Sequence, residues 1–243
     1  MILSAHQPAY LPWLPLLDLI AQSDVFVVLD AVQFEKGSFV NRNKILLNGK
    51  EHWLTIPVHA HDKSTIADTK IDWEQPWLRK HCESVKHAYG KSSSLESWLK
   101  HIETLAECRH LGPLAIRDLE FWCKQFGITT PIKMMPLKKR KPGGTELILD
   151  LMADFKADTY LAGPLFKNYV NEELWQSSPY SWITHKVSPA LEALPPLSAL
   201  HYWMTGIDNP FSSSPDIQMT KPLDAEEPSA VLSHRDFRST SSL

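Results

Sequence analysis

The chain has few cysteines, few glycines and no long apolar run, and each shortage narrows what the protein can be. Its three cysteines are an odd number, and none belongs to a C-x-x-C pair. We therefore expect free thiols in a reducing compartment, not a disulfide framework. No run approaches the roughly 18–20 apolar residues that a membrane-spanning helix needs. The first residues also lack the basic and apolar regions of a signal peptide, so we expect a cytoplasmic protein.

An excess of charge of one sign is also missing. The 25 Lys and Arg residues nearly balance the 28 Asp and Glu residues, which leaves a net charge of −3. This balance argues against a general affinity for nucleic acid. The chain is instead rich in proline and tryptophan, with 18 Pro and nine Trp against nine Gly in 243 residues. A chain of this length buries a substantial core, and its many fixed bends and flat side chains suit a small-molecule pocket.

The first thirty residues predict a strand, a helix and a second strand. Residues 2–5 are short and apolar, and residues 13–21 carry apolar side chains at helical spacing. Residues 24–30 form a continuous β-branched and aromatic run between two acids, which is typical of a buried strand in a parallel sheet. Together they predict a βαβ unit, whose connection is almost always right-handed.

A hairpin and an all-helical insert are predicted next. Asn48-Gly49 is the strongest two-residue hairpin signal, and it lies between the apolar stretches 44–47 and 52–58. Residues 66–71 are a further candidate strand. Between residues 75 and 126 we expect three helices, with breaks near 90–94 and 110–113.

A second α/β stretch completes the predicted domain. We expect strands over 132–135, 158–162 and 181–185, and helices over 145–155 and 197–205. The predicted fold class is α/β, with a Rossmann-like parallel core sheet, a β-hairpin and the helical insert in one domain over residues 1–209. Beyond residue 210 the composition shifts to Ser, Pro and acids, so we expect a flexible C-terminal tail.

Polar side chains follow the first two predicted strands. In open parallel sheets ligands bind beyond the carboxyl ends of the strands. We expect His6 to move a proton or contact a phosphate, with Asp30 orienting it from the neighbouring strand. Gln7, Tyr10 and Gln33 are candidate substrate contacts. The alternative is ordinary loop structure, with a histidine satisfied in its loop, a packed tyrosine and an aspartate that caps a turn.

Two basic stretches are candidate anion-binding elements. Arg42 and Asn43 lie at the entry to the hairpin, where a guanidinium suits bidentate contact with a carboxylate or phosphate. Farther along, a basic run precedes two glycines and a predicted helix start, where backbone N–H groups favour anions. Its candidate residues are Lys138, Lys139, Arg140 and Thr145. The alternatives are a solvated turn and a solvated basic loop, since neither stretch matches a known phosphate-loop motif.

No metal, cofactor or nucleic acid is indicated by a motif. His59-x-His61-Asp62 has ligand-like spacing, but no further ligands can be identified, so we expect no metal site. RNA binding through residues 138–141 is disfavoured, because basic and aromatic residues do not alternate there. We therefore expect a small anionic molecule as the partner.

Three stretches resemble the WbqC-like family: residues 5–13 (Ala-His-Gln-Pro-Ala-Tyr-Leu-Pro-Trp), residues 24–36 and residues 41–44 (Asn-Arg-Asn-Lys). A looser likeness continues to about residue 208. The family is named for a protein linked to O-antigen polysaccharide biosynthesis. The resemblance implies a bacterial transferase or amide-forming ligase that acts on a small phosphorylated or nucleotide-activated substrate. It also implies a set of site residues, namely His6, Gln7, Tyr10, Asp30, Gln33, Arg42 and Asn43.

The chain departs from the family pattern in three places. Ala31 stands where a second acid is usual, Gly37 stands where a basic residue is common, and residues 185–201 lack an expected Tyr-rich stretch and an Asp. The missing acid, together with the Trp-rich insert, leaves a second hypothesis open. In it the protein is a non-enzymatic binding or scaffold protein that uses the helical insert as a partner surface. The sequence does not determine the oligomeric state.

Overall fold

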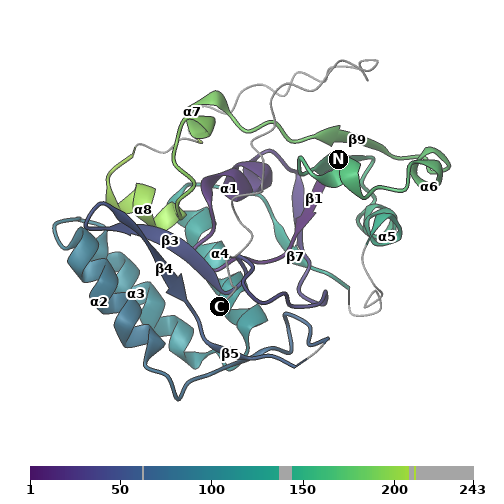
Figure 1. The fold of residues 1–243 in the computed structure, drawn as a ribbon. Helices are drawn as coiled ribbons and strands as arrows, with labels where there is room; N and C mark the ends of the chain where they lie inside the picture. Colours follow the sequence, from purple (N-terminus) through teal and green to yellow (C-terminus); the bar gives the residue numbers. More distant parts are fainter. Residues whose placement is uncertain (62, 137–143, 208–210, 212–243) are drawn as a thin grey trace, which may run out of the picture.

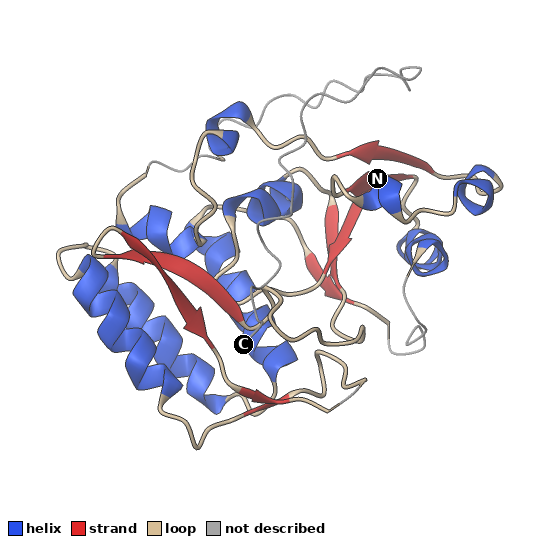
Figure 2. Ribbon diagram, viewed as in Figure 1, coloured by secondary structure: helices blue, strands red, loops and turns tan. Residues whose placement is uncertain are grey.

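A five-stranded parallel sheet forms the centre of the computed structural model, which describes residues 1–61, 63–136, 144–207 and 211 (Figures 1 and 2). Its strands are β1 Ile2–His6, β2 Val25–Val28, β7 Ile132–Met134, β8 Thr159–Ala162 and β9 Ser181–Thr184. They lie in the order β7-β2-β1-β8-β9, and every neighbouring pair is parallel. The Rossmann-like α/β class is therefore confirmed. The strand order reverses between β1 and β8, and ligands of open α/β sheets bind at such a switch point.

Helices cover both faces of this sheet, so alternate residues of the central strands β1 and β2 are buried on opposite sides. Leu3 and Val27 pack with α5 Thr145–Phe155 and α6 Glu172–Gln176. Phe26 belongs to the other cluster, which holds α1 Leu14–Ala21, α4 Leu111–Gln125 and α8 Ala199–Met204. Figure 1 shows α5 and α6 on one side of the sheet and α1 and α4 on the other. Burial on two faces explains why the sequence of β2, Val-Phe-Val-Val, is continuously apolar.

The predicted hairpin is confirmed. Strands β3 Arg42–Leu47 and β4 Lys50–Thr55 pair antiparallel, and the turn residues Asn48 and Gly49 both have positive φ, at 53° and 74°. The candidate strand over 66–71 is much shorter than expected. Only β6 Lys70–Ile71 pairs, with β5 Val58–His59, because the backbone before it bonds instead to the segment after β2 through Ile66 and Val32.

The helical insert lies beside the hairpin (Figure 1). It contains α2 Trp77–Tyr89, α3 Leu95–Thr104, the 3₁₀ turn η1 Leu105–Glu107 and α4. The break at 90–94 is confirmed, but the second break precedes Leu111, where α4 begins. Pro113 therefore lies in the first turn of α4, where it removes no helical hydrogen bond. The three cysteines are free, as expected, although Cys108 follows η1 and is not helical.

The remaining short elements follow β8 and β9. They are η3 Phe166–Asn168 and α7 Pro189–Glu192. Within the described ranges, no helix is both long enough and apolar enough to cross a membrane. The predicted tail lies almost wholly outside the described residues, and so does the basic run at 138–141.

The loop after β1, residues 7–13, bonds to three other parts of the fold. Its Leu11 is fully buried with φ +50°, a left-handed conformation that costs a non-glycine residue roughly 1–2 kcal/mol. The Leu11 N–H donates to Asp118 Oδ2 of α4 at 2.6 Å, and the Leu11 carbonyl accepts from Asn43 Nδ2 of β3 at 2.6 Å. Asp118 also accepts from His101 Nε2 of α3 at 2.9 Å. The strained conformation is thus held by bonds to the hairpin and to the insert.

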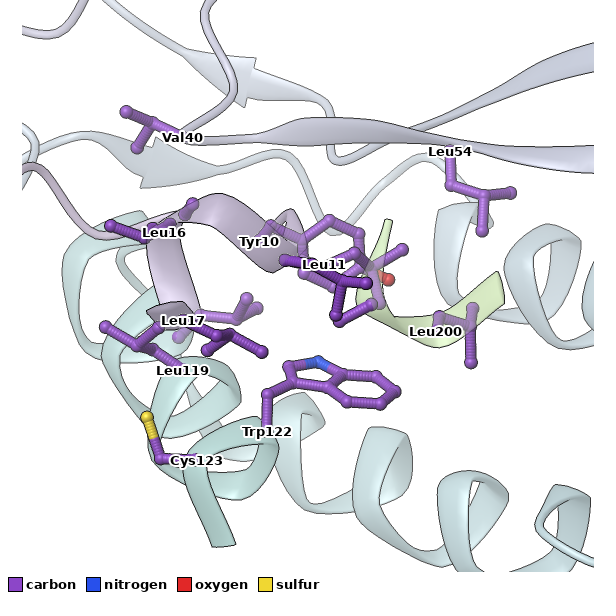
Figure 3. Packing of buried hydrophobic residues seen from close by; sticks show 14 of the residues in the cluster. Tyr10, Leu11, Leu16, Leu17, Val40, Leu54, Leu119, Trp122, Cys123 and Leu200 are labelled. Carbon is purple, nitrogen blue, oxygen red and sulfur yellow. The ribbon is translucent and has the colours of Figure 1, made fainter. Parts of the chain in front are cut away.

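Tyr10 anchors the same loop to α2. Its hydroxyl lies 2.9 Å from Nδ1 of His81, and the two rings stack. Both side chains are buried. Figure 3 shows Tyr10 and Leu11 above the indole of Trp122 in the cluster between the loop and α4. Residues 8–12 of this loop are therefore packed core.

Asp118→Ala tests the importance of the Leu11 bond. The change leaves the Leu11 N–H and His101 Nε2 without their buried acceptor, so we expect the free energy of unfolding to fall by about 3–5 kcal/mol. Glu120→Ala on the exposed face of α4 is the matched control and should stay within about 0.5 kcal/mol. Denaturant unfolding measures both. Equal effects of the two changes would contradict the assigned role of Asp118.

His81 makes a separate prediction about pH. Burial lowers the pKa of His81 from its usual 6.5 to about 4, because the charged ring is poorly solvated. The unfolded chain then binds more protons than the folded one between these values. The contribution of neutral His81 to the free energy of unfolding is therefore fully present above pH 6.5. As the pH drops toward 4, the free energy of unfolding falls by up to about 3 kcal/mol.

The measurement is urea unfolding across this pH range for the unchanged protein and for His81→Gln. The variant should lose this part of the pH dependence. His87→Gln, an exposed position on the same helix, should keep it. If the unchanged protein and His81→Gln had parallel pH profiles, the buried neutral state of His81 would be excluded as the cause.

Candidate functional site

Two of the predicted site residues lie at the ends of adjacent strands. β1 ends at His6, which is paired with Val28 in β2. The ladder extends one residue farther, because the Leu29 N–H donates to the His6 carbonyl at 2.9 Å. Asp30 follows at once, and its carbonyl accepts from the Ala67 N–H at 2.8 Å. His6 and Asp30 therefore follow neighbouring strands to the same edge of the sheet, with His6 next to the switch point.

The tautomer of His6 follows from its hydrogen bond. Its Nδ1 lies 2.8 Å from the Gln7 carbonyl, and a carbonyl can only accept, so Nδ1 carries the hydrogen. Burial lowers the pKa of His6 below 6.5, although the bond to the Gln7 carbonyl opposes this shift. The ring is therefore neutral at pH 7, and Nε2 has a free lone pair. No described residue bonds to Nε2, so this atom can accept a proton.

Aromatic rings connect His6 to the hairpin. His6 packs edge-on against Trp13, with 5.5 Å between ring centroids. Trp13 lies 5.3 Å from Phe39, and Phe39 lies 6.0 Å from Trp53 on β4. Trp53 is exposed, while Trp13 and Phe39 are half-buried. We call these four side chains the aromatic row.

Arg42 lies at the far end of this row. Its guanidinium carbon is 4.4 Å from the centre of the Trp53 ring. Its Nε and Nη2 both donate to the Gly37 carbonyl, at 3.0 and 2.6 Å. Lys44 also faces Trp53, at 5.1 Å, and forms an ion pair of 2.6 Å with Glu51. The structure thus connects Arg42 with His6 through neighbouring rings.

Two predicted substrate contacts are buried away from this edge. Tyr10 is fully buried, and its hydroxyl is bonded to His81. Asn43 is 1% exposed, with Nδ2 bonded to the Leu11 carbonyl and Oδ1 accepting from the Lys44 N–H. These polar groups have partners within the protein, where they support the loop after β1.

The other predicted contacts are more dispersed. Gln7 is half-buried next to His6, and Gln33 is exposed on the segment paired with Thr65. Thr145 begins α5, and its Oγ1 accepts from the Asn171 N–H at 2.7 Å, which ties the helix start to the loop after β8. Lys138, Lys139 and Arg140 lie outside the described residues.

The sequence prediction missed Phe39 and Trp53. The signal for Trp53 was present, because counting outward from Asn48-Gly49 pairs Lys44 with Trp53 across the hairpin. A second omission is the buried pair of Asp18 in α1 and His185 after β9, with 2.8 Å between Oδ2 and Nε2. Because His185 lies 167 residues from Asp18, no local pattern indicates this pair.

A shallow hollow of about 370 Å³ lies elsewhere in the molecule. It is bordered by Cys123 and Lys124 near the end of α4 and by Thr130 before β7. This is the amino end of the sheet, whereas His6 is at the carboxyl end, so the hollow is separate from the candidate site. Among the residues that the structure describes, no group of three or more His, Cys, Asp or Glu gathers as metal ligands would.

Comparison with known proteins identifies a family for this chain. The model of the WbqC-like protein family matches residues 7–192, which include the loop after β1, the hairpin and the insert. An uncharacterized protein of Mycobacterium tuberculosis, Rv1507c, is 29% identical over 174 residues, covering 70% of this chain and 75% of that protein. No solved structure matches the chain. Because the family match extends over well more than half of its length, the chain belongs to the WbqC-like protein family.

Proposed function

We propose that this protein is a transferase or amide-forming ligase with His6 as its general base. Its substrate is a small phosphorylated or nucleotide-activated molecule, used in surface-polysaccharide biosynthesis or in a related amide- or acyl-transfer step. The observation that carries the proposal is the neutral His6 ring at the switch point, with Nδ1 held by the Gln7 carbonyl and Nε2 bonded to none of the described residues. A base with a fixed tautomer beside a ligand-binding edge suits proton removal from an attacking group.

The proposed reaction follows from this geometry. An amine or hydroxyl of the acceptor gives its proton to His6 Nε2 as it forms a bond to the activated carbon. The phosphate or nucleotide leaves with the electron pair of the bond that breaks. Asp30, at the end of the adjacent strand, stabilises the imidazolium by its negative charge. The Lys and Arg side chains of the candidate anion-binding elements stabilise the leaving anion. The Gln7 carbonyl takes the orienting role that the sequence suggested for Asp30.

The scaffold hypothesis loses its main support. It relied on tryptophans of the helical insert as a partner surface. Trp77 is 3% exposed, and Trp98 and Trp122 are fully buried. These rings fill the core between α2, α3, α4 and the loop after β1, so they do not offer an aromatic surface to a partner. Family membership is compatible with either hypothesis, and the chemistry of His6 favours the enzyme.

The test begins with thermal-shift screening against ATP, CoA and nucleotide sugars. We expect at least one of them to raise the unfolding temperature, and Lys139→Gln to weaken that effect. With the best-stabilising compound as donor, release of its nucleotide or phosphate measures turnover. His6→Ala should lower the rate about 10²–10⁴-fold. Turnover should also fall as the pH drops through the lowered pKa of His6, because the protonated ring cannot accept a proton.

His87→Ala, an exposed histidine on α2, is the control and should keep the full rate. A His6→Ala protein that folds normally and turns over at the unchanged rate would refute the proposed base. The absence of stabilisation by all three compound classes would count against an activated substrate.

A further inference from the structure

The Arg42 side chain is held in one orientation by the protein itself. Its Nε and Nη2 donate to one acceptor, the Gly37 carbonyl, and its plane lies over Trp53. Those bonds use the side edge of the guanidinium. Of its five N–H donors, the two on Nη1 and one on Nη2 are left, and one from each of these nitrogens forms the end-on fork. This fork matches the two oxygens of a carboxylate or phosphate.

Gly37 makes the arrangement possible. Its φ is +84°, a left-handed conformation that favours glycine, and a Cβ there would lie 3.2 Å from Arg42 Nη2. A side chain at position 37 would therefore strain the backbone and push against the guanidinium. Gly37, one of the departures from the family pattern, is thus the residue whose carbonyl binds and positions Arg42.

Arg42 also differs in its partners from two other arginines, Arg79 and Arg117. Arg79 pairs with Glu83 and Arg117 pairs with Glu107, in both cases at the surface. No described carboxylate pairs with Arg42, although Arg42 is half-buried. The neighbouring cation, Lys44, has its charge matched by Glu51. A positioned, half-buried guanidinium that has no acid partner among the described residues indicates a place for an external anion.

The aromatic row offers a surface for the rest of the molecule that carries such an anion. Trp53 is 37% exposed beside Arg42, and the half-buried Phe39 and Trp13 continue the row to His6. Aromatic rings pack well against the apolar C–H faces of a ring-shaped ligand. An anionic group bound at Arg42 would therefore direct the ring to which it is attached along the row toward Nε2 of His6.

We propose that Gly37, Arg42 and Trp53 form an acid-binding subsite for a sugar that carries a carboxylate or a phosphate. The acid binds the end-on fork of Arg42, and the sugar ring lies against Trp53 and Phe39. This inference rests on the proposed function only where it names a sugar as the part of the ligand that carries the acid. To the proposed function it adds the substrate class, a sugar that carries an acid. It also makes the hairpin, and not the sheet alone, one wall of the site.

The test is isothermal titration calorimetry of the full chain with four probes: glucose 1-phosphate, glucuronate, glucose and inorganic phosphate. We expect both anionic sugars to bind more tightly than glucose, which lacks the acid, and more tightly than inorganic phosphate, which lacks the ring. A preference between the two anionic sugars identifies phosphate or carboxylate as the natural acid. Binding of inorganic phosphate as tight as that of glucose 1-phosphate would overturn the role of the aromatic row.

Variants separate the fork from simple charge. Arg42→Lys keeps the cation but loses the fork, so affinity for the anionic sugars should fall roughly 10- to 100-fold. Gly37→Ala keeps Arg42 itself and should also weaken binding. Arg79→Gln removes one equivalent charge from the surface of α2 and should leave affinity unchanged. Equal affinity in the unchanged protein and Arg42→Lys would overturn the subsite.

Two further measurements keep the result interpretable. The indole N–H resonance of Trp53, assigned by its loss in Trp53→Phe, should shift in the unchanged protein when glucose 1-phosphate is added. A probe that binds without moving this resonance would overturn the inference even if the Arg42 variants fold poorly. His6→Ala should still bind the anionic sugars. If the anionic sugars bind and the unchanged protein shows no turnover, the subsite stands and the proposed function fails. If the protein does turn over and Arg42→Lys leaves the rate unaffected, the proposed function stands and the subsite fails.

Discussion

The hydrogen bond from the Leu11 N–H to Asp118 is the contact on which the rest of the architecture depends. It holds a fully buried residue in a left-handed conformation, and the same carboxylate accepts from His101. The Leu11 carbonyl is bound by Asn43 from the hairpin. One short loop therefore joins the sheet, the hairpin and the insert, and it begins at His6. The loop that follows the candidate base is therefore bonded to the same residues that join the hairpin and the distant helices.

This dependence explains what local sequence patterns revealed and what they did not. The helix predicted over 145–155 matches α5, and the hairpin register follows from Asn48-Gly49, because both signals act between near neighbours. Tyr10 and Asn43 resembled substrate contacts, since polar residues beside a strand end suit ligand binding. Their actual partners include His81, 71 residues from Tyr10, and no periodicity indicates such a distant contact.

Part of the candidate site could be predicted from the sequence, and part of it could not. The adjacency of the two strands that lead to His6 and Asp30 follows from the βαβ rule, which places consecutive parallel strands side by side. The link between His6 and Arg42 needed Phe39, a residue outside any regular element whose location only the folded chain defines. Gly37 appeared as a departure from the family pattern, whereas in the structure it supplies the carbonyl that holds Arg42.

The acceptor that fixes the His6 ring is a main-chain carbonyl, and this has a consequence for how the site can change. A mutation at position 7 replaces the glutamine side chain but leaves that oxygen in place. The following Pro8 is buried and has a restricted φ, so the peptide has little freedom to turn away. Evolution or a protein engineer can therefore vary the side chain at position 7, while the protonation pattern of the His6 ring is inherited unaltered.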